Sequence, residues 1–244
     1  MTEPKQQTNL TSLLGGAGKG LNYLFRFFVP RTCPLCHREL LEEEEWLCVV
    51  CMGELMNQQS CDDEKGIGDH LFDRIPYEHA ANLYNYRRQT PSSSLIKRAK
   101  YGNRMYINEQ LAELFANELA CVGWPFDIDV IVPIPIHWRR RWIRTYNQVD
   151  PIAQGLSKVW NLPVEYDCLY KHKHTPSQLT RSYQERLTAA DGVFSIRHPE
   201  RLRGKHVLLV DDVVTSGGTM TSGASTLLTI EGLRISILAL AFTQ

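Results

Sequence analysis

Two adjacent carboxylates, Asp211 and Asp212, follow a short apolar run near the C-terminus. The run, Val207–Val210, has the composition of a buried parallel strand. Open α/β sheets bind their ligands at the carboxyl ends of such strands. Neighbouring acids at a buried strand end repel each other and lose hydration, so they are a poor choice for structure alone. The pair therefore indicates a ligand site; the alternative is a strand–turn–helix whose turn is merely tight and polar.

The loop after the acids has the composition of a phosphate cradle. It contains three hydroxyl side chains and two glycines, Thr215, Ser216, Gly217, Gly218 and Thr219, and a helical segment is expected to follow to about Glu231. Glycines let successive backbone N–H groups point inward, and a helix N-terminus adds positive potential. Carboxylates do not bind phosphate but suit vicinal hydroxyls or a hydrated divalent cation. A phosphate beside a diol is ribose 5-phosphate.

A second apolar run is broken by prolines and followed by basic residues. A strand is predicted over Val130–Val132, with residues 133–137 as its irregular exit, because proline removes a ladder donor. Between residues 137 and 186 the chain contains nine Lys and Arg residues and only four acidic residues. The candidate contacts are Pro133, Ile134, His137, Arg139, Arg140, Arg141, Arg144, Arg181 and Arg186. Each alone fits a solvated loop; together they are expected to neutralise a diphosphate or a nucleic-acid backbone.

Four cysteines form two Cys-x-x-Cys pairs, Cys33 with Cys36 and Cys48 with Cys51. This spacing is typical of a tetrahedral structural zinc site, whereas a redox pair would need one motif at the start of a helix. A segment of this size cannot bury a sufficient core, so the metal would supply its folding energy. From residue 38 to 64 the chain carries nine acids and one base, which disfavours direct DNA binding there.

Length and composition fit one ordinary domain and a small module. The predicted boundaries are a tail and apolar helix over 1–32, the cysteine module over 33–62 and the main domain over 75–244. The 244 residues are 43% hydrophobic with a formal net charge of zero, which gives no global sign of nucleic-acid binding. No apolar run approaches the ~20 residues of a membrane span, and no secretory signal is recognisable, so a cytoplasmic protein is expected.

The stretch from Lys205 to Met220 resembles the phosphoribosyl-diphosphate signature of type I phosphoribosyltransferases. The whole chain resembles the ComF family, also called competence protein F or GntX-like proteins. The motifs that carry this resemblance are both cysteine pairs, Lys100-Tyr-Gly, Val132–His137, Arg141-x-x-Arg-Thr-Tyr-Asn-Gln148, Thr175-Pro-Ser-Gln178 and Val210–Thr219. Thr145 departs from the pattern, because the family usually has glycine there.

The resemblance implies an α/β fold: a type I phosphoribosyltransferase-like parallel sheet with flanking helices, preceded by a small zinc ribbon with four cysteine ligands. By the same resemblance, Asp211 and Asp212 hold ribose hydroxyls, and Thr215–Thr219 hold the 5-phosphate. Zinc would be structural, and Mg²⁺ would accompany phosphoribosyl diphosphate. The implied role is in competence and DNA uptake: handling incoming single-stranded DNA beside uptake and recombination proteins. The implied location is the cytoplasm, with a peripheral position at the inner face of the membrane left open.

Two other functions stay open. The chain could be an active phosphoribosyltransferase that transfers ribose 5-phosphate to an unknown acceptor, with Mg²⁺ and basic side chains stabilising the leaving diphosphate. It could also be a non-catalytic sensor of phosphoribosyl diphosphate. The sequence identifies neither an acceptor pocket nor a catalytic side chain.

Overall fold

The computed structural model describes residues 31–58, 66–87, 89–101, 104–124, 127–136, 147–171 and 193–243, without the side chain of Tyr101. The chain divides after Gly53 into two compact units. The boundaries predicted from the sequence stay a prediction.

The N-terminal unit is built around the first cysteine pair. A turn over Cys33–Cys36 is closed by an antiparallel bridge between Thr32 and Glu39 and by a hydrogen bond of 2.8 Å from the Cys33 N–H to the Arg38 carbonyl. The second pair lies at the start of helix α2 (Val49–Met56), whose first residue follows Cys48. The module thus has little regular structure, as expected of a fold organised by its cysteines.

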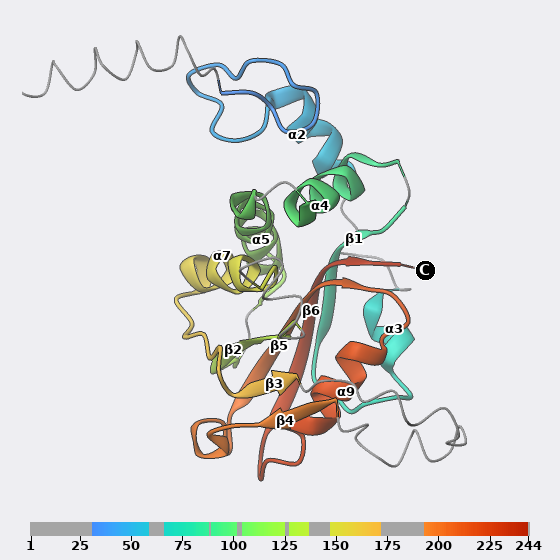
Figure 1. The fold of residues 1–244 in the computed structure, drawn as a ribbon, viewed down its shortest axis with the longest axis vertical. Helices are drawn as coiled ribbons and strands as arrows, with labels where there is room; N and C mark the ends of the chain where they lie inside the picture. The colour runs from blue at the N-terminus through green and yellow to red at the C-terminus, as the bar shows by residue number, and fades with distance from the viewer. Residues whose placement is uncertain are drawn as a thin grey trace, which may run out of the picture. The chain divides into compact units, whose positions relative to one another are not determined.

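The C-terminal unit contains a four-stranded parallel sheet in the order β1-β6-β5-β2 (Figure 1). The strands are β1 (Ala80–Asn85), β2 (Val130–Pro133), β5 (His206–Val214) and β6 (Arg234–Phe242). β5 and β6 are buried along almost their whole length, because helices cover both faces of the sheet. The parallel sheet with flanking helices confirms the predicted fold class.

Two helix layers cover the sheet. On one face lie α4 (Pro91–Tyr101), α5 (Met105–Ala120) and α7 (Asp150–Trp160). On the other, α3 (Ile67–Leu71) and α9 (Gly218–Leu227) share a buried apolar cluster with alternate residues of β2, β5 and β6. Among the described residues, no helix is long and apolar enough to cross a bilayer.

A two-stranded antiparallel hairpin, β3 (Leu169–Lys171) with β4 (Phe194–Ile196), packs against α9. Leu169 and Phe194 are buried in the same apolar cluster as α9. A short 3-10 turn, η1 (Pro199–Arg201), leads from this hairpin towards β5. The hairpin therefore lies over the α9 face of the sheet.

Two local predictions need correction. β5 does not end at Val210 but continues through both acids to Val214, because its pairing with β6 continues from Asp211 with Ala239 to Val214 with Phe242. Helix α9 ends at Leu227, not near Glu231. On the other side of β5, the pairing with β2 stops at Pro133 with Val210. The sheet therefore has a step at Asp211, where β5 extends beyond β2.

Candidate functional site

The two acids occupy opposite faces of β5, since successive side chains of a strand alternate. Asp211 is in phase with Val207 and Leu209, which belong to the cluster beneath α9. Asp212 points to the face of α4, α5 and α7 and is 9% exposed. At the step in the sheet, the Asp212 N–H donates to the Asp211 carboxylate at 2.8 Å. One dipeptide thus presents a carboxylate on each side of the strand.

The Asp211 carboxyl resists ionisation. Burial, and next the charge of Asp212, raise its pKa to about 7, although Lys100 and Lys171 act in the opposite direction. A carboxyl poised in this way favours a ligand that supplies hydrogen-bond donors or positive charge. Strongly perturbed acids in a hollow are frequent at functional sites.

The phosphate-cradle residues line one small surface pocket. Its walls are Asp211 and every residue from Val213 to Met220, so it contains all five loop residues predicted from the sequence. Helix α9 begins at Gly218, and none of the side chains that the structure describes caps its N-terminus. Its first N–H groups are therefore available to an anion, which the helix dipole also favours. The pocket has the size and the donors suited to one phosphate group.

Gly217 is required by both conformation and space. Its φ is +74°, in the left-handed region. A Cβ at this position would lie 2.7 Å from Leu71 Cδ2 and 3.3 Å from Arg74 Nη1. Arg74 also donates a hydrogen bond to the Ser216 carbonyl. The cradle is thus held from behind by α3 and the turn after it.

The predicted exit of β2 lies beside the acids. Ile134 is buried; its N–H donates to the Val210 carbonyl at 2.8 Å, and its own carbonyl accepts from Asn147 Nδ2 at 3.2 Å. Pro133 pairs with Val210. Both backbone groups of Ile134 are therefore engaged, and this residue positions the exit. The other predicted contacts, His137, Arg139, Arg140, Arg141, Arg144, Arg181 and Arg186, lie outside the described residues.

A lysine reaches the same edge from α4. Lys100 Nζ lies 2.8 Å from Asp212 Oδ2, and the two side chains are only 24% and 13% exposed. The Lys100 carbonyl accepts from Gln148 Nε2 at 3.0 Å, and the Gln148 carbonyl accepts from Asn108 Nδ2 at 3.0 Å. The adjacent Asn147 and Gln148 thus tie the β2 exit to α4 and α5.

A second lysine lies on the other face. Lys171 ends β3, and its Nζ lies 5.1 Å from the centroid of the Phe194 ring. Its charge lowers the pKa of Asp211, in opposition to burial. The two acids therefore have a lysine on each side of the sheet.

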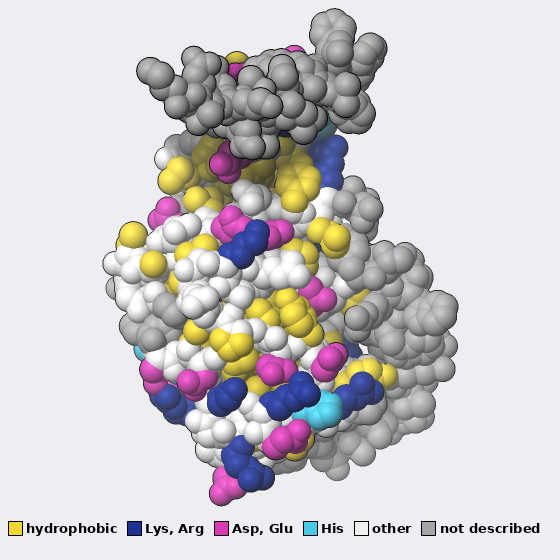
Figure 2. All heavy atoms as spheres, turned by 90° about the vertical axis from the view of Figure 1, so that its left-hand side faces the viewer, with side chains coloured by type: hydrophobic (Ala, Val, Ile, Leu, Met, Phe, Trp, Pro, Cys, Tyr) yellow, Lys and Arg dark blue, Asp and Glu magenta, His cyan; other side chains and the backbone are white. Residues whose placement is uncertain are grey.

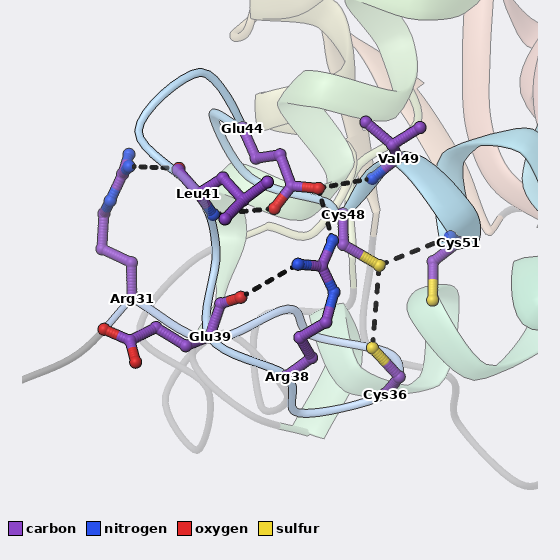
Figure 3. Close-up of polar contacts among 9 residues, drawn as sticks. All are labelled: Arg31, Cys36, Arg38, Glu39, Leu41, Glu44, Cys48, Val49 and Cys51. Carbon is purple, nitrogen blue, oxygen red and sulfur yellow. Dashed lines mark hydrogen bonds and ion pairs between the residues drawn. The ribbon is translucent and has the colours of Figure 1, made fainter.

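In the N-terminal unit, the four cysteines converge. The Sγ atoms of Cys33, Cys36, Cys48 and Cys51 (the four-cysteine cluster) all lie within 4.8 Å of one another. Cys36 Sγ and Cys48 Sγ are 3.7 Å apart (Figure 3). Ligands of a tetrahedral zinc ion at about 2.3 Å are about 3.8 Å from one another. The thiols therefore fit a tetrahedral metal ion.

Local hydrogen bonds favour a thiolate in this cluster. Burial opposes ionisation of Cys48, but hydrogen bonds from the Cys51 N–H and the neighbouring thiols outweigh it and lower the Cys48 pKa to about 6. Beside it, the buried Glu44 carboxylate accepts from the N–H groups of Val49 and Leu41 and from Arg38 (Figure 3). These bonds lower the pKa of Glu44. Glu44 thus links the segment between the two cysteine pairs, through Arg38 and Leu41, to the start of α2 at Val49.

Comparison with known proteins agrees with this geometry. The model of the phosphoribosyl transferase domain family matches residues 149–243. Competence protein F of Haemophilus influenzae is 27% identical over 206 residues, 77% of this chain and 86% of that protein. The DNA utilization protein YhgH of Escherichia coli K12 is 27% identical over 212 residues, 82% of this chain and 92% of that protein. These matches support the resemblance of the chain to the ComF family.

Solved structures resemble this chain more distantly. The B. subtilis glutamine phosphoribosylpyrophosphate amidotransferase complexed with ADP and GMP is 18% identical, with a TM-score of 0.38 over 53% of this chain and 25% of that one. The Trypanosoma brucei adenine phosphoribosyl transferase in complex with AMP, pyrophosphate and ribose-5-phosphate is 11% identical, with a TM-score of 0.40 over 68% of this chain and 87% of that one.

Three residues at the site were not predicted as ligand contacts. In the sequence, Lys100 is marked only by the Lys100-Tyr-Gly motif. Asn147 is marked only by the motif that ends at Gln148, and Arg74 belongs to no motif, because it meets the cradle across 142 residues of sequence. The Lys-Tyr-Gly motif was the one pattern that could have directed attention to Lys100.

Proposed function

We propose that this protein is a competence or DNA-utilisation factor that handles incoming single-stranded DNA on the cytoplasmic side and binds Mg²⁺–phosphoribosyl diphosphate. The observation that carries the ligand is the cradle of α9 beside the step of β5: a hollow lined by the phosphate loop and Asp211 lies next to the strand that also carries Asp212. The 5-phosphate would occupy the hollow, and the ribose hydroxyls would donate to Asp211 and Asp212. The diphosphate would lie towards the β2 exit, with Mg²⁺ neutralising part of its charge.

The DNA role is supported by the names of the relatives, competence protein F and DNA utilization protein. Four of the basic residues expected to contact a DNA backbone, Arg139, Arg140, Arg141 and Arg144, lie in sequence between Ile136 and Asn147, and Asn147 donates a hydrogen bond to the Ile134 carbonyl at the site. On the face shown in Figure 2, basic and acidic described side chains lie next to one another. Among the described residues, Arg201 forms an ion pair with Glu165. A surface that carries both signs of charge is a weaker candidate for DNA binding than the arginine-rich segment, which is therefore the preferred DNA contact.

For the N-terminal unit we infer a structural zinc ion held by the four-cysteine cluster. Three of the four cysteines are buried, as expected of a closed structural site. Glu39, Glu42, Glu43 and Glu45 are exposed on this unit. Their charge disfavours DNA there, so an uptake or recombination protein is the more suitable partner for this unit.

An active phosphoribosyltransferase is the second candidate, because the acid pair and the phosphate loop are both intact. This activity would transfer ribose 5-phosphate to an acceptor and release diphosphate. Nucleobases would then be consumed in the presence of Mg²⁺–phosphoribosyl diphosphate. A sensor would bind the same ligand without turnover.

The test is calorimetric titration of the full chain with Mg²⁺–phosphoribosyl diphosphate, with and without saturating single-stranded DNA. We expect binding in both cases for separate sites and competition for a shared one. The Asp212→Asn variant should lose ligand affinity while its circular dichroism stays unchanged. A wild-type chain that does not bind the ligand would refute the small-molecule part, and one that does not bind DNA would refute the DNA part.

A further inference from the structure

The ion pair between Lys100 and Asp212 has a consequence for the ligand. Asp212 is one of the two acids expected to accept ribose hydroxyls, yet its Oδ2 is already engaged by the Lys100 ammonium at 2.8 Å. Its Oδ1 accepts the Val213 N–H at 2.6 Å. Each oxygen of the Asp212 carboxylate therefore has one partner and can still accept a further hydrogen bond. Of the two partners, only the lysine side chain can move away, so the Lys100 contact is the one that a ribose hydroxyl can displace.

The position of Lys100 indicates where its ammonium can go. Its backbone is tied through Gln148 and Asn147 to the carbonyl of Ile134, the residue that follows β2 and still donates its N–H to β5. The α4 end is thus anchored to the exit towards which the diphosphate would point. The ammonium lies on a flexible four-carbon stem, so it can turn from a carboxylate to a phosphate while its backbone stays fixed.

A structural salt bridge is the competing interpretation. A partly buried pair is expensive to desolvate, and replacement by apolar groups is often neutral for stability. Lys100 also acts on the charge of Asp211, because it lowers the pKa of that acid. A single ammonium that compensates both acids has its charge placed for the ligand site and not only for α4.

We propose that Lys100 is a diphosphate-sensing residue. Its ammonium neutralises Asp212 in the absence of diphosphate, and it moves to the diphosphate of a bound ligand, which frees Asp212 for the ribose hydroxyls. The inference rests on the proposed function, because it requires a phosphoribosyl ligand in the site. It makes Lys100 a residue that discriminates phosphoribosyl diphosphate from ribose 5-phosphate, which has the same ribose and 5-phosphate but no diphosphate.

The experiment compares two ligands on the wild type and on Lys100→Met. Calorimetry with Mg²⁺ should show that the variant binds phosphoribosyl diphosphate about 10- to 100-fold more weakly, as expected for a lost charge-assisted contact. The affinity of the variant for ribose 5-phosphate should be unchanged or higher, because this ligand no longer has to displace a lysine from Asp212. Lys100→Gln retains a hydrogen-bond donor for Asp212 and should show the same selective loss if the methionine variant folds poorly.

The matched control is Lys97→Met, an exposed lysine one turn earlier on α4 with the same change in charge. It should leave both affinities unchanged. Equal losses for the two ligands in Lys100→Gln would show a structural ion pair and overturn the sensing role, as would no loss for either. Failure of the wild type to bind either ligand would refute the proposed function and this inference with it. If the wild type binds both ligands, the results for the Lys100 variants test the sensing role alone.

Discussion

Replacement of Gly217 by alanine should damage the phosphate cradle while the fold persists. The new Cβ would lie 2.7 Å from Leu71 Cδ2, on a backbone with φ of +74°. A left-handed non-glycine residue costs about 1–2 kcal/mol, and overpacking of a close contact typically about 1–3 kcal/mol. The sum, about 2–5 kcal/mol, is large beside the about 5–15 kcal/mol of a typical domain.

Gly218→Ala is the matched control. A Cβ at Gly218 meets nothing nearer than Ser216 Oγ at 3.8 Å, and this glycine has no positive φ. Surface changes without such features usually stay within about 0.5 kcal/mol. The neighbouring substitutions thus add the same methyl group in two different environments, so their difference isolates the conformation and the contact at Gly217.

Urea denaturation followed by circular dichroism would measure both variants against the wild type, and calorimetry would measure ribose 5-phosphate binding. We expect Gly217→Ala to lower the free energy of unfolding by about 2–5 kcal/mol. Any Gly217→Ala protein that remains folded should bind ribose 5-phosphate more weakly, because Leu71 and Arg74 must shift behind the loop. Equal free energies of unfolding for the two alanine variants would refute the reasoning that this loop is held rigidly by α3.

Two further predictions concern the acids and the cysteines. The pKa of Asp211 is raised from 3.8 to about 7, so between these pH values the folded protein keeps a proton on this carboxyl that the unfolded chain has lost. The contribution of this group to stability therefore declines as pH rises from about 4 to 7. Urea denaturation across this range should show that decline in the wild type relative to Asp211→Asn, and a constant difference would contradict the raised pKa. Cys36→Ser should reduce zinc content well below about one ion per chain and destabilise the N-terminal unit. Cys121→Ser, at an exposed cysteine outside the four-cysteine cluster, should retain the metal, and full zinc in both variants by metal analysis would argue against the site.

Local patterns in the sequence predicted the parts of the site that local chemistry determines. The apolar run, the acid pair and the glycine loop are contiguous, and the structure places Asp211 and the loop around one pocket. The cysteine spacing predicted a cluster that the structure contains. The predicted end of β5 was wrong, because the length of this strand depends on pairing with β6, which follows later in the chain.

Contacts between segments that are far apart in the sequence could not be predicted for the same reason. Lys100 is a basic helical residue like its neighbours until the fold places it 2.8 Å from Asp212. Arg74 has no motif around it, yet it supports the Ser216 carbonyl. Ile134 belonged to a predicted binding exit, but its backbone groups are used by Val210 and Asn147. Periodicity and spacing do not encode such pairings; packing of the whole unit decides them.

The adjacency of the two acids has a geometric reason. Residues two apart on a strand would share one face, whereas Asp211 and Asp212 face opposite sides of the sheet. Only a ligand that lies across the strand can contact both, and the pairing of β5 with β2 stops at Val210 with Pro133, before the two acids. The cradle of α9 lies on the Asp211 side, and Lys100 lies on the Asp212 side. A ribose with a phosphate at one end and a diphosphate at the other matches this order of charges across the strand.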